Sequence, residues 1–230
     1  MWWGLALVGL IGIVWSVRSL FVDDDSSPFF THLDLLYTAD GRDNPWQVRH
    51  EWMPPAILSD ETEPAPPSKR YNADIAFVGN ITDYGHAEWA DHRKRLHMQL
   101  KQWYHNRYQV FPGRGRPAIR GFELRRLYAT TKVNIGDSCL VNCEGKYHSD
   151  RIPETLGRGG FLIHPWTPDL PELYPMLPLY PLGDFDQLKK MIDQALDEPD
   201  KRQSIAQANR EWVLEHHTYE KRLERLLELL

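Results

Sequence analysis

Short apolar runs alternate with amphipathic segments from Asn72 to the end of the chain, and this alternation constrains the fold more than any other feature. The run "ADIAFVGN" predicts a buried strand that ends at Gly79 and Asn80. The following segment, "HAEWADHRKRLHMQLKQWYH", predicts a helix because its large apolar residues recur at helical spacing, at Trp89, Leu96, Leu100 and Trp103.

The same alternation continues through the rest of the chain. The runs "YQVFPG", "KVNIGDS" and "GFLIHP" predict further strands, and "GFELRRLYATT" and "DRIPETLGR" predict the helices between them. From Phe185 to Leu230 the pattern is helical, with breaks expected at Pro199 and Thr218. Strands that alternate with helices in this way predict an α/β fold, a doubly wound (Rossmann-like) parallel sheet with helices on both faces.

The amino-terminal segment, residues 2–22, is largely apolar and carries a single charge, at Arg18. A membrane-spanning helix needs about 20 apolar residues, and Trp2 and Trp3 resemble residues that anchor a helix at the membrane interface. Two interpretations stay open. The segment is either a single anchor at the cytoplasmic face of a membrane or a strand and turn that belong to a larger α/β domain.

A Pro-rich stretch separates this segment from the predicted sheet. A short strand, Leu33–Thr38, comes first, and "MPPAILSDETEPAPPSKR" then holds five prolines in eighteen residues. Such proline density disfavours both helix and central strand, so an extended linker is expected. We therefore divide the chain into an apolar segment, a remnant strand with a hinge, and a compact domain, at 1–22, 23–71 and 72–230.

The composition excludes several classes of protein. Thirty-two acidic and 27 basic residues give a net charge of −5 without a basic block, so a nucleic-acid partner is not expected. The only cysteines, Cys139 and Cys143, suit a reducing compartment such as the cytoplasm. With His148 they would supply three ligands, whereas a structural zinc site needs four, so no metal is expected.

Ligands of a doubly wound sheet bind outside the carboxyl ends of its strands. The predicted strand ends are expected to share one edge, and they are Gly79-Asn80, Pro112-Gly113, Gly136–Ser138 and His164-Pro165. Gly79 and Asn80 either admit a phosphate close to the backbone or form an ordinary turn. The loop "GRGRP" that follows Pro112 lacks the spacing of a phosphate-binding loop and is expected to be solvated.

The stretch "YHSDRIPETLGR" places a helix start at this edge. Ser149 or Asp150 is the expected cap, and the positive end of the helix dipole favours an anion such as a diphosphate. Arg151, Glu154 and Arg158 share one helix face. They form either a surface ion-pair ladder or a ligand site in which Arg151 contacts phosphate and Glu154 accepts hydrogen bonds from two sugar hydroxyls.

Taken together, the segments from residue 73 to residue 230 resemble the carboxyl-terminal half of a GT-B glycosyltransferase, in its group-1, spore-maturation-like subset. The resemblance rests on "IRGFELRRLYATTKVNIGDS", "YHSDRIPETLGRGGFLIHP" and the closing run that ends in "HTYEKRL". It implies transfer of a sugar from a nucleotide diphosphate sugar donor to an acceptor hydroxyl, with no cofactor and no metal. The sugar and the acceptor are not implied.

The resemblance also implies roles for individual residues. Glu154 matches the carboxylate that binds the ribose of the donor. The residues that match the diphosphate side of the site are Gly79, Asn80, Ser149, Asp150 and Arg151, and those that line the same cleft are Arg120, Gly121, Asp137 and Ser138. The resemblance implies no catalytic base. His148 and His164 are candidates because they lie near the predicted strand ends.

Two departures from the family pattern leave the activity open. Members with the paired form of the motif have a second glutamate eight residues before the ribose-binding one, and this position is Lys146 here. Most of the amino-terminal domain also has no counterpart in the sequence. Three alternatives follow. The chain is an enzyme whose acceptor domain comes from a second chain, a nucleotide-sugar-binding module without turnover, or a membrane-tethered interaction domain.

Overall fold

The structure, a computed structural model, describes residues 36–38, 49–79, 81, 87–113, 115–137 and 148–229, without the side chains of 36–38 and 87–90. Residues 36–38 and 49–54 belong to a small unit, in which β1 (Leu36–Thr38) pairs in parallel with β2 (His50–Trp52). The expected segment at 2–22 lies outside the described residues. Within the part of the chain that is described, no helix is both long enough and apolar enough to cross a membrane.

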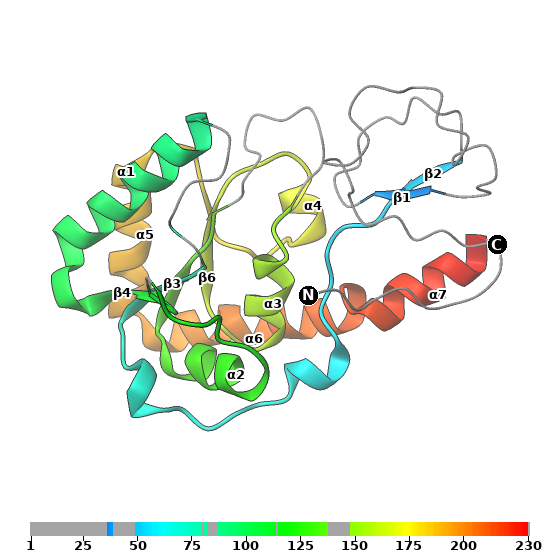
Figure 1. Cartoon of the computed structure of the whole chain (residues 1–230), viewed down its shortest axis with the longest axis horizontal. Coiled ribbons are helices and arrows are strands. Elements are labelled where there is room, and N and C mark those ends of the chain that lie inside the picture. Colours follow the sequence, from blue (N-terminus) through cyan, green and yellow to red (C-terminus); the bar gives the residue numbers. More distant parts are fainter. Residues whose placement is uncertain are drawn as a thin grey trace. The chain divides into compact units, whose positions relative to one another are not determined.

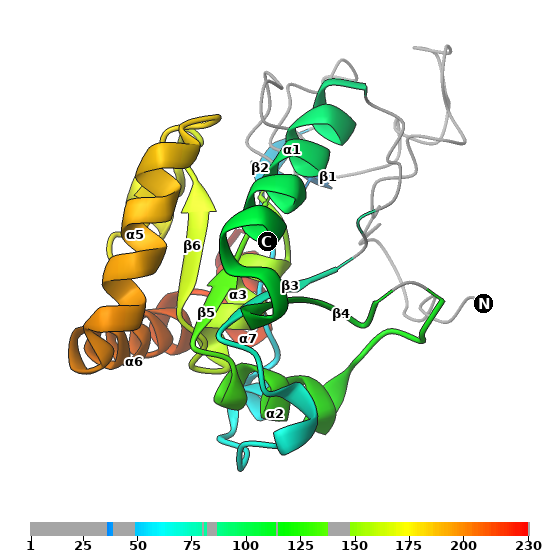
Figure 2. The same cartoon turned by 90° about the vertical axis from the view of Figure 1, so that its left-hand side faces the viewer.

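The larger unit begins at Pro55 and is built on a five-stranded parallel sheet with the order β4-β3-β5-β6-β7 (Figure 1). Its strands are β3 (Ile75–Val78), β4 (Tyr108–Phe111), β5 (Val133–Ile135), β6 (Leu162–Pro165) and β7 (Leu179–Tyr180). Figure 2 shows β5 and β6 as neighbouring arrows that point the same way. The strand order reverses beside β3, and a ligand of such a sheet binds at the carboxyl ends where this reversal occurs.

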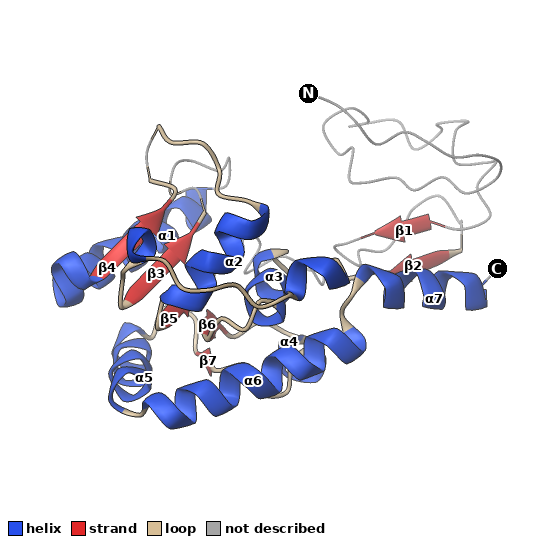
Figure 3. Cartoon of the chain, turned by 90° about the horizontal axis from the view of Figure 1, so that it is seen from below, coloured by secondary structure: helices blue, strands red, loops and turns tan. Residues whose placement is uncertain are grey.

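Helices cover both faces of the sheet, which confirms the expected doubly wound fold. The helices of the larger unit are α1 (Ala87–Tyr104), α2 (Gly121–Thr130), α3 (Arg151–Gly157), α4 (Leu170–Leu173), α5 (Phe185–Asp197), α6 (Pro199–His216) and α7 (Tyr219–Leu229). Figure 3 shows α2 and α3 on one side of the strands and α5 on the other. One core cluster joins the strands to α1 and α5, and the clusters under α2 and α3 lie against the opposite face.

Local sequence explains most of these elements. Leu96 and Leu100 of α1 are fully buried, as their helical spacing predicts. Pro199 occupies the first turn of α6, and the Thr218 hydroxyl accepts a hydrogen bond from the Lys221 N–H at 3.3 Å at the start of α7. The sequence reasoning missed α4 and β7, because four prolines between residues 170 and 181 hide a one-turn helix and a two-residue strand.

The Pro-rich stretch packs onto the larger unit and is not the extended linker that its prolines suggest. Ile57 is 2% exposed, and its backbone pairs with the short segment that joins α6 to α7. The Ile57 N–H donates to the His217 oxygen at 3.1 Å, and the Ile57 oxygen accepts from the Tyr219 N–H at 3.0 Å. Farther along, the buried Tyr71 ring packs edge-on against Phe111 of β4. The functional division at Asn72 stays a prediction, although the compact unit itself begins at Pro55.

Replacement of Ile57 by alanine should lower the free energy of unfolding by about 2–5 kcal/mol, because a buried Ile side chain would leave a cavity. The adjacent Leu58 is 47% exposed and supplies the matched control. Leu58→Ala should cost less than about 0.5 kcal/mol. Urea unfolding of the two variants measures both values, and equal losses would show that residues 55–58 are not part of the folded core.

Candidate functional site

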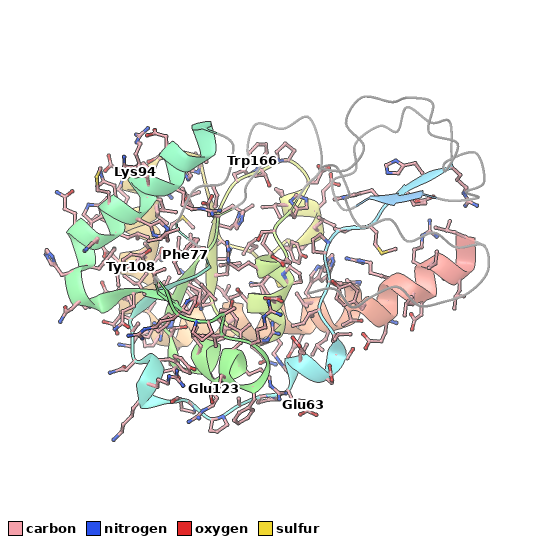
Figure 4. The ribbon with its side chains drawn as sticks, viewed as in Figure 1. Glu63, Phe77, Lys94, Tyr108, Glu123 and Trp166 are labelled. Atoms are coloured by element: carbon pink, nitrogen blue, oxygen red, sulfur yellow. The ribbon has the colours of Figure 1, made fainter. Side chains whose placement is uncertain are left out.

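The guanidinium of Arg151 lies where the carboxyl ends of β3 and β5 meet. Its Nη1 donates a hydrogen bond to the backbone oxygen of Asp137, just beyond β5, at 3.1 Å. Its Cζ lies 4.8 Å from the centroid of the Phe77 ring, which projects from β3 and is labelled in Figure 4. One side chain at the start of α3 therefore contacts both strand ends, at the position where the topology predicts a ligand.

Gly79 makes room for this guanidinium. A Cβ atom at Gly79 would lie 2.4 Å from Nη2 of Arg151. The φ angle of Gly79 is also +150°, in the region that favours glycine. The structure thus brings together Gly79, Arg151 and Asp137, three of the residues that the sequence placed in the site.

A buried ion pair holds Asp137, just beyond the end of β5. Nε of Arg93 in α1 lies 2.6 Å from Oδ2 of Asp137, and both side chains are almost fully buried. The Arg93 Cζ also lies 5.8 Å from the centroid of the Phe77 ring. The Asp137 carboxylate therefore faces another side chain of the protein, and it is the Asp137 backbone oxygen that contacts Arg151.

The sequence reasoning missed Arg93, although a signal was present. Arg93 precedes Leu96 by three residues and Leu100 by seven, so it lies on the buried face of α1. A charged residue on an apolar helix face requires a buried partner of opposite charge. The sequence could therefore have predicted an acidic partner for Arg93, although not which one.

The start of α3 is held by Ser149. The Ser149 hydroxyl accepts from the Arg151 N–H at 3.3 Å and donates to Oδ1 of Asp150 at 3.3 Å. The Asp150 side chain makes no capping hydrogen bond to the helix. Of the two expected caps, Ser149 is thus the one that contacts the backbone of the first turn.

Of the two alternatives for Arg151, Glu154 and Arg158, a surface ladder does not describe Arg158, because the Arg158 side chain is only 1% exposed. Its Nη1 donates to the backbone oxygen of Glu154 at 3.0 Å, and its Nη2 pairs with Oε2 of Glu61. The Glu154 side chain is 36% exposed. Burial raises the pKa of the Glu154 carboxyl, and the nearby Arg158 charge opposes this rise. Glu61 was missed because it lies in the stretch interpreted as a linker.

The two candidate bases, His148 and His164, are both buried. Nδ1 of His164 lies 2.7 Å from the Pro165 backbone oxygen, which can only accept a hydrogen bond, so Nδ1 carries the proton. Burial lowers the pKa of His164 to about 3. His164 is therefore neutral at physiological pH, and neither histidine side chain is open to solvent.

Arg120 and Gly121 make no contact with the Arg151 group that the structure records, and other predicted residues lie outside the described part of the chain. Arg120 and Gly121 begin α2, where Arg120 is exposed and a Cβ at Gly121 would meet nothing within 4 Å. Asn80 and Ser138 fall outside the described residues, as do Cys139 and Cys143. Among the residues that are described, no cluster of His, Cys, Asp and Glu side chains is arranged to hold a metal ion.

Replacement of Arg93 by methionine should destabilise the fold by about 3–5 kcal/mol, because it removes the positive charge that lies 2.6 Å from the buried Asp137 carboxylate. The double variant Arg93→Met/Asp137→Asn should recover part of this loss, since the buried negative charge is then removed. Lys94→Met, on the exposed face of the same helix (Figure 4), is the control and should change stability by less than about 0.5 kcal/mol. Thermal unfolding compares the variants, and an equal loss for Arg93→Met and Lys94→Met would contradict a role for the ion pair.

The fold is shared with several solved structures. Alr3699/HepE from Anabaena, in a crystal structure with UDP and glucose, aligns with a TM-score of 0.60 at 11% identity over 86% of this chain and 63% of its own. A glycosyltransferase from Rickettsia africae aligns with a TM-score of 0.57 at 13% identity, over 85% of this chain and 62% of its own. Sucrose-phosphate synthase from Thermosynechococcus elongatus aligns with a TM-score of 0.55 at 13% identity, over 86% of this chain and 57% of its own. At these identities the likeness shows the fold, which is that of the carboxyl-terminal half of a GT-B protein.

This chain spans about 57–63% of the length of those three proteins. No curated protein sequence matches it. A family model described as glycosyl transferase-like matches residues 64–228, most of the chain. The chain therefore belongs to the glycosyl transferase-like family.

Proposed function

We propose that this chain binds a nucleotide diphosphate sugar at the carboxyl edge of its sheet and serves as the donor-binding half of a glycosyltransferase. The observation that carries the proposal is the position of Arg151, whose guanidinium lies against both Gly79 and the Asp137 backbone oxygen. Ligands of doubly wound sheets bind at such an edge, and a fixed guanidinium favours an anionic one. Alr3699/HepE, with the same fold, was crystallised with UDP and glucose.

The chemistry of glycosyl transfer explains what Arg151 would contribute. As the bond between the anomeric carbon and the diphosphate breaks, negative charge develops on the leaving phosphate oxygens. A guanidinium has five N–H donors, one of which contacts Asp137, and a diphosphate would supply acceptors for others. A positive charge fixed before the reaction stabilises this developing charge without further reorganisation.

Glu154 lies one helical turn beyond Arg151 on the same face of α3 and would bind the ribose of the donor. Its carboxylate is partly exposed and can accept hydrogen bonds from two adjacent hydroxyls. The partial burial that raises its pKa also strengthens a hydrogen bond made at this position. The spacing of the two side chains thus suits a ligand in which a diphosphate is joined to a ribose.

Transfer also requires an acceptor site and a base, for which we propose a second chain or residues outside the described part. The burial of His148 and His164 favours one alternative, a module that binds the donor without turnover. Release of nucleotide diphosphate over time, measured with and without candidate acceptors and partner chains, separates the two functions. Release that depends on an acceptor supports the enzyme, whereas binding without release supports the module.

Arg151→Gln should weaken the binding of UDP or GDP, and of their sugars, by at least about tenfold, because it removes charge-assisted hydrogen bonds to the diphosphate. Arg225→Gln is a matched control, since Arg225 is exposed on α7 and pairs with Glu228 at 3.2 Å. Isothermal titration calorimetry measures the affinities, and thermal unfolding verifies that both variants fold. The proposal would be wrong if the natural chain bound no nucleotide diphosphate, or if Arg151→Gln and Arg225→Gln bound it equally well.

A further inference from the structure

Arg158 lies between two carboxylates that come from distant parts of the sequence. Glu154 precedes it by one turn of α3, and Glu61 belongs to the Pro-rich stretch, 97 residues away. The Arg158 side chain is almost fully buried, whereas each glutamate keeps part of its side chain exposed. One buried guanidinium therefore has two possible carboxylate partners, and one of them is the proposed ribose ligand.

The guanidinium of Arg158 is tied to its own helix, and the end of that helix packs against the Pro-rich stretch. Its Nη1 donates to the Glu154 backbone oxygen at 3.0 Å, which ties it to α3. Next to it, Gly157 packs so closely that a Cβ would lie 3.1 Å from Ile57 and 3.2 Å from Val213. The end of α3 therefore packs closely against Ile57, four residues before Glu61.

The position of Glu61 is fixed as firmly. Ser59 donates from its hydroxyl to Oε2 of Glu220 in α7 at 2.8 Å. One residue beyond Glu61, the backbone oxygen of Thr62 accepts from Nη2 of Arg210 in α6 at 3.0 Å. Hydrogen bonds on both sides therefore place the Glu61 carboxylate beside Arg158.

The two glutamates do not share Arg158 equally. Glu61 pairs directly with Nη2, whereas Oε2 of Glu154 is 3.9 Å from Nη1, at the outer limit of an ion pair. A glutamate four residues before an arginine on a helix is otherwise well placed to pair with it. The closer carboxylate of Arg158 is thus that of Glu61, and Nη1, the nitrogen nearer the Glu154 carboxylate, donates to the Glu154 backbone oxygen.

We propose that Glu61 is a positioning residue for the donor site, because it occupies Arg158 and so leaves the Glu154 carboxylate available to ligand hydroxyls. This inference rests on the proposed function of Glu154 as the ribose ligand. It gives the Pro-rich stretch a part in nucleotide recognition, through a residue that does not itself contact the ligand. Without the charge of Glu61, the 3.9 Å pair of Arg158 with Glu154 would close, and the ribose would lose its acceptor.

The test compares the affinities for UDP and for 2′-deoxy-UDP, whose ratio measures recognition of the ribose hydroxyl. The natural chain should prefer UDP by at least about tenfold, since a hydrogen bond to a charged group is lost in the deoxy compound. Glu154→Gln and Glu61→Gln should both reduce this ratio several-fold or more. Glu63→Gln is the matched control, because Glu63 lies on the same stretch but is 75% exposed and 3.5 Å from Arg125, and it should keep the ratio.

A double variant separates positioning from a general structural role. In Glu61→Gln/Arg158→Met, Arg158 is no longer there to draw Glu154 away from the ligand, so the preference for UDP should return toward that of the natural chain. Carbon NMR of the Glu154 carboxyl gives a readout without ligand. Its pKa should fall in Glu61→Gln, which removes a neighbouring negative charge and releases Arg158 to Glu154, and should not change in Glu63→Gln.

The possible failures are distinguishable. If the natural chain does not prefer UDP, or if Glu154→Gln keeps the preference, the proposed role of Glu154 is wrong. If Glu154→Gln loses the preference but Glu61→Gln retains it, only the positioning role of Glu61 is overturned. A double variant that discriminates no better than Glu61→Gln would also overturn it.

Discussion

The contact of the Arg151 guanidinium with two strand ends is the interaction on which the rest of the proposed site depends. It requires the reversal of strand order beside β3, which brings the ends of β3 and β5 together. It also requires a glycine at position 79 and a fixed backbone at Asp137, which the buried pair with Arg93 provides. The elements that carry these residues otherwise pack through apolar cores. The proposed site differs from them because polar and charged groups make its contacts.

The fold was largely predictable because its long helices show their apolar period and most of its strands are continuous apolar runs. Leu96 and Leu100 fixed the buried face of α1, and the apolar runs of β3 and β6 stood out between polar turns. The prediction failed where prolines dominated the local pattern. In the stretch from Pro55 to Tyr71 the prolines suggested an open chain, although the burial of Ile57 and Tyr71 by distant helices and strands determines its path.

The site was predictable only in part, and the reason is the range of its contacts. The position of Arg151 beside Gly79 follows from strand-end topology, which the order of elements reveals. The pairs of Arg93 with Asp137 and of Arg158 with Glu61 join residues 44 and 97 positions apart. No local pattern encodes which partner a buried charge finds, so these pairs emerged only from the structure.

The central claim is that a nucleotide diphosphate binds at the edge formed by β3, β5 and α3. Titration of UDP into the isotopically labelled chain, followed by NMR shifts of backbone amides, tests it most directly. The account predicts that the largest shifts occur at Gly79, Asp137 and the first turn of α3, from Arg151 to Glu154, with little change in α7. Shifts confined to other surfaces, or none at saturating UDP, would contradict the account.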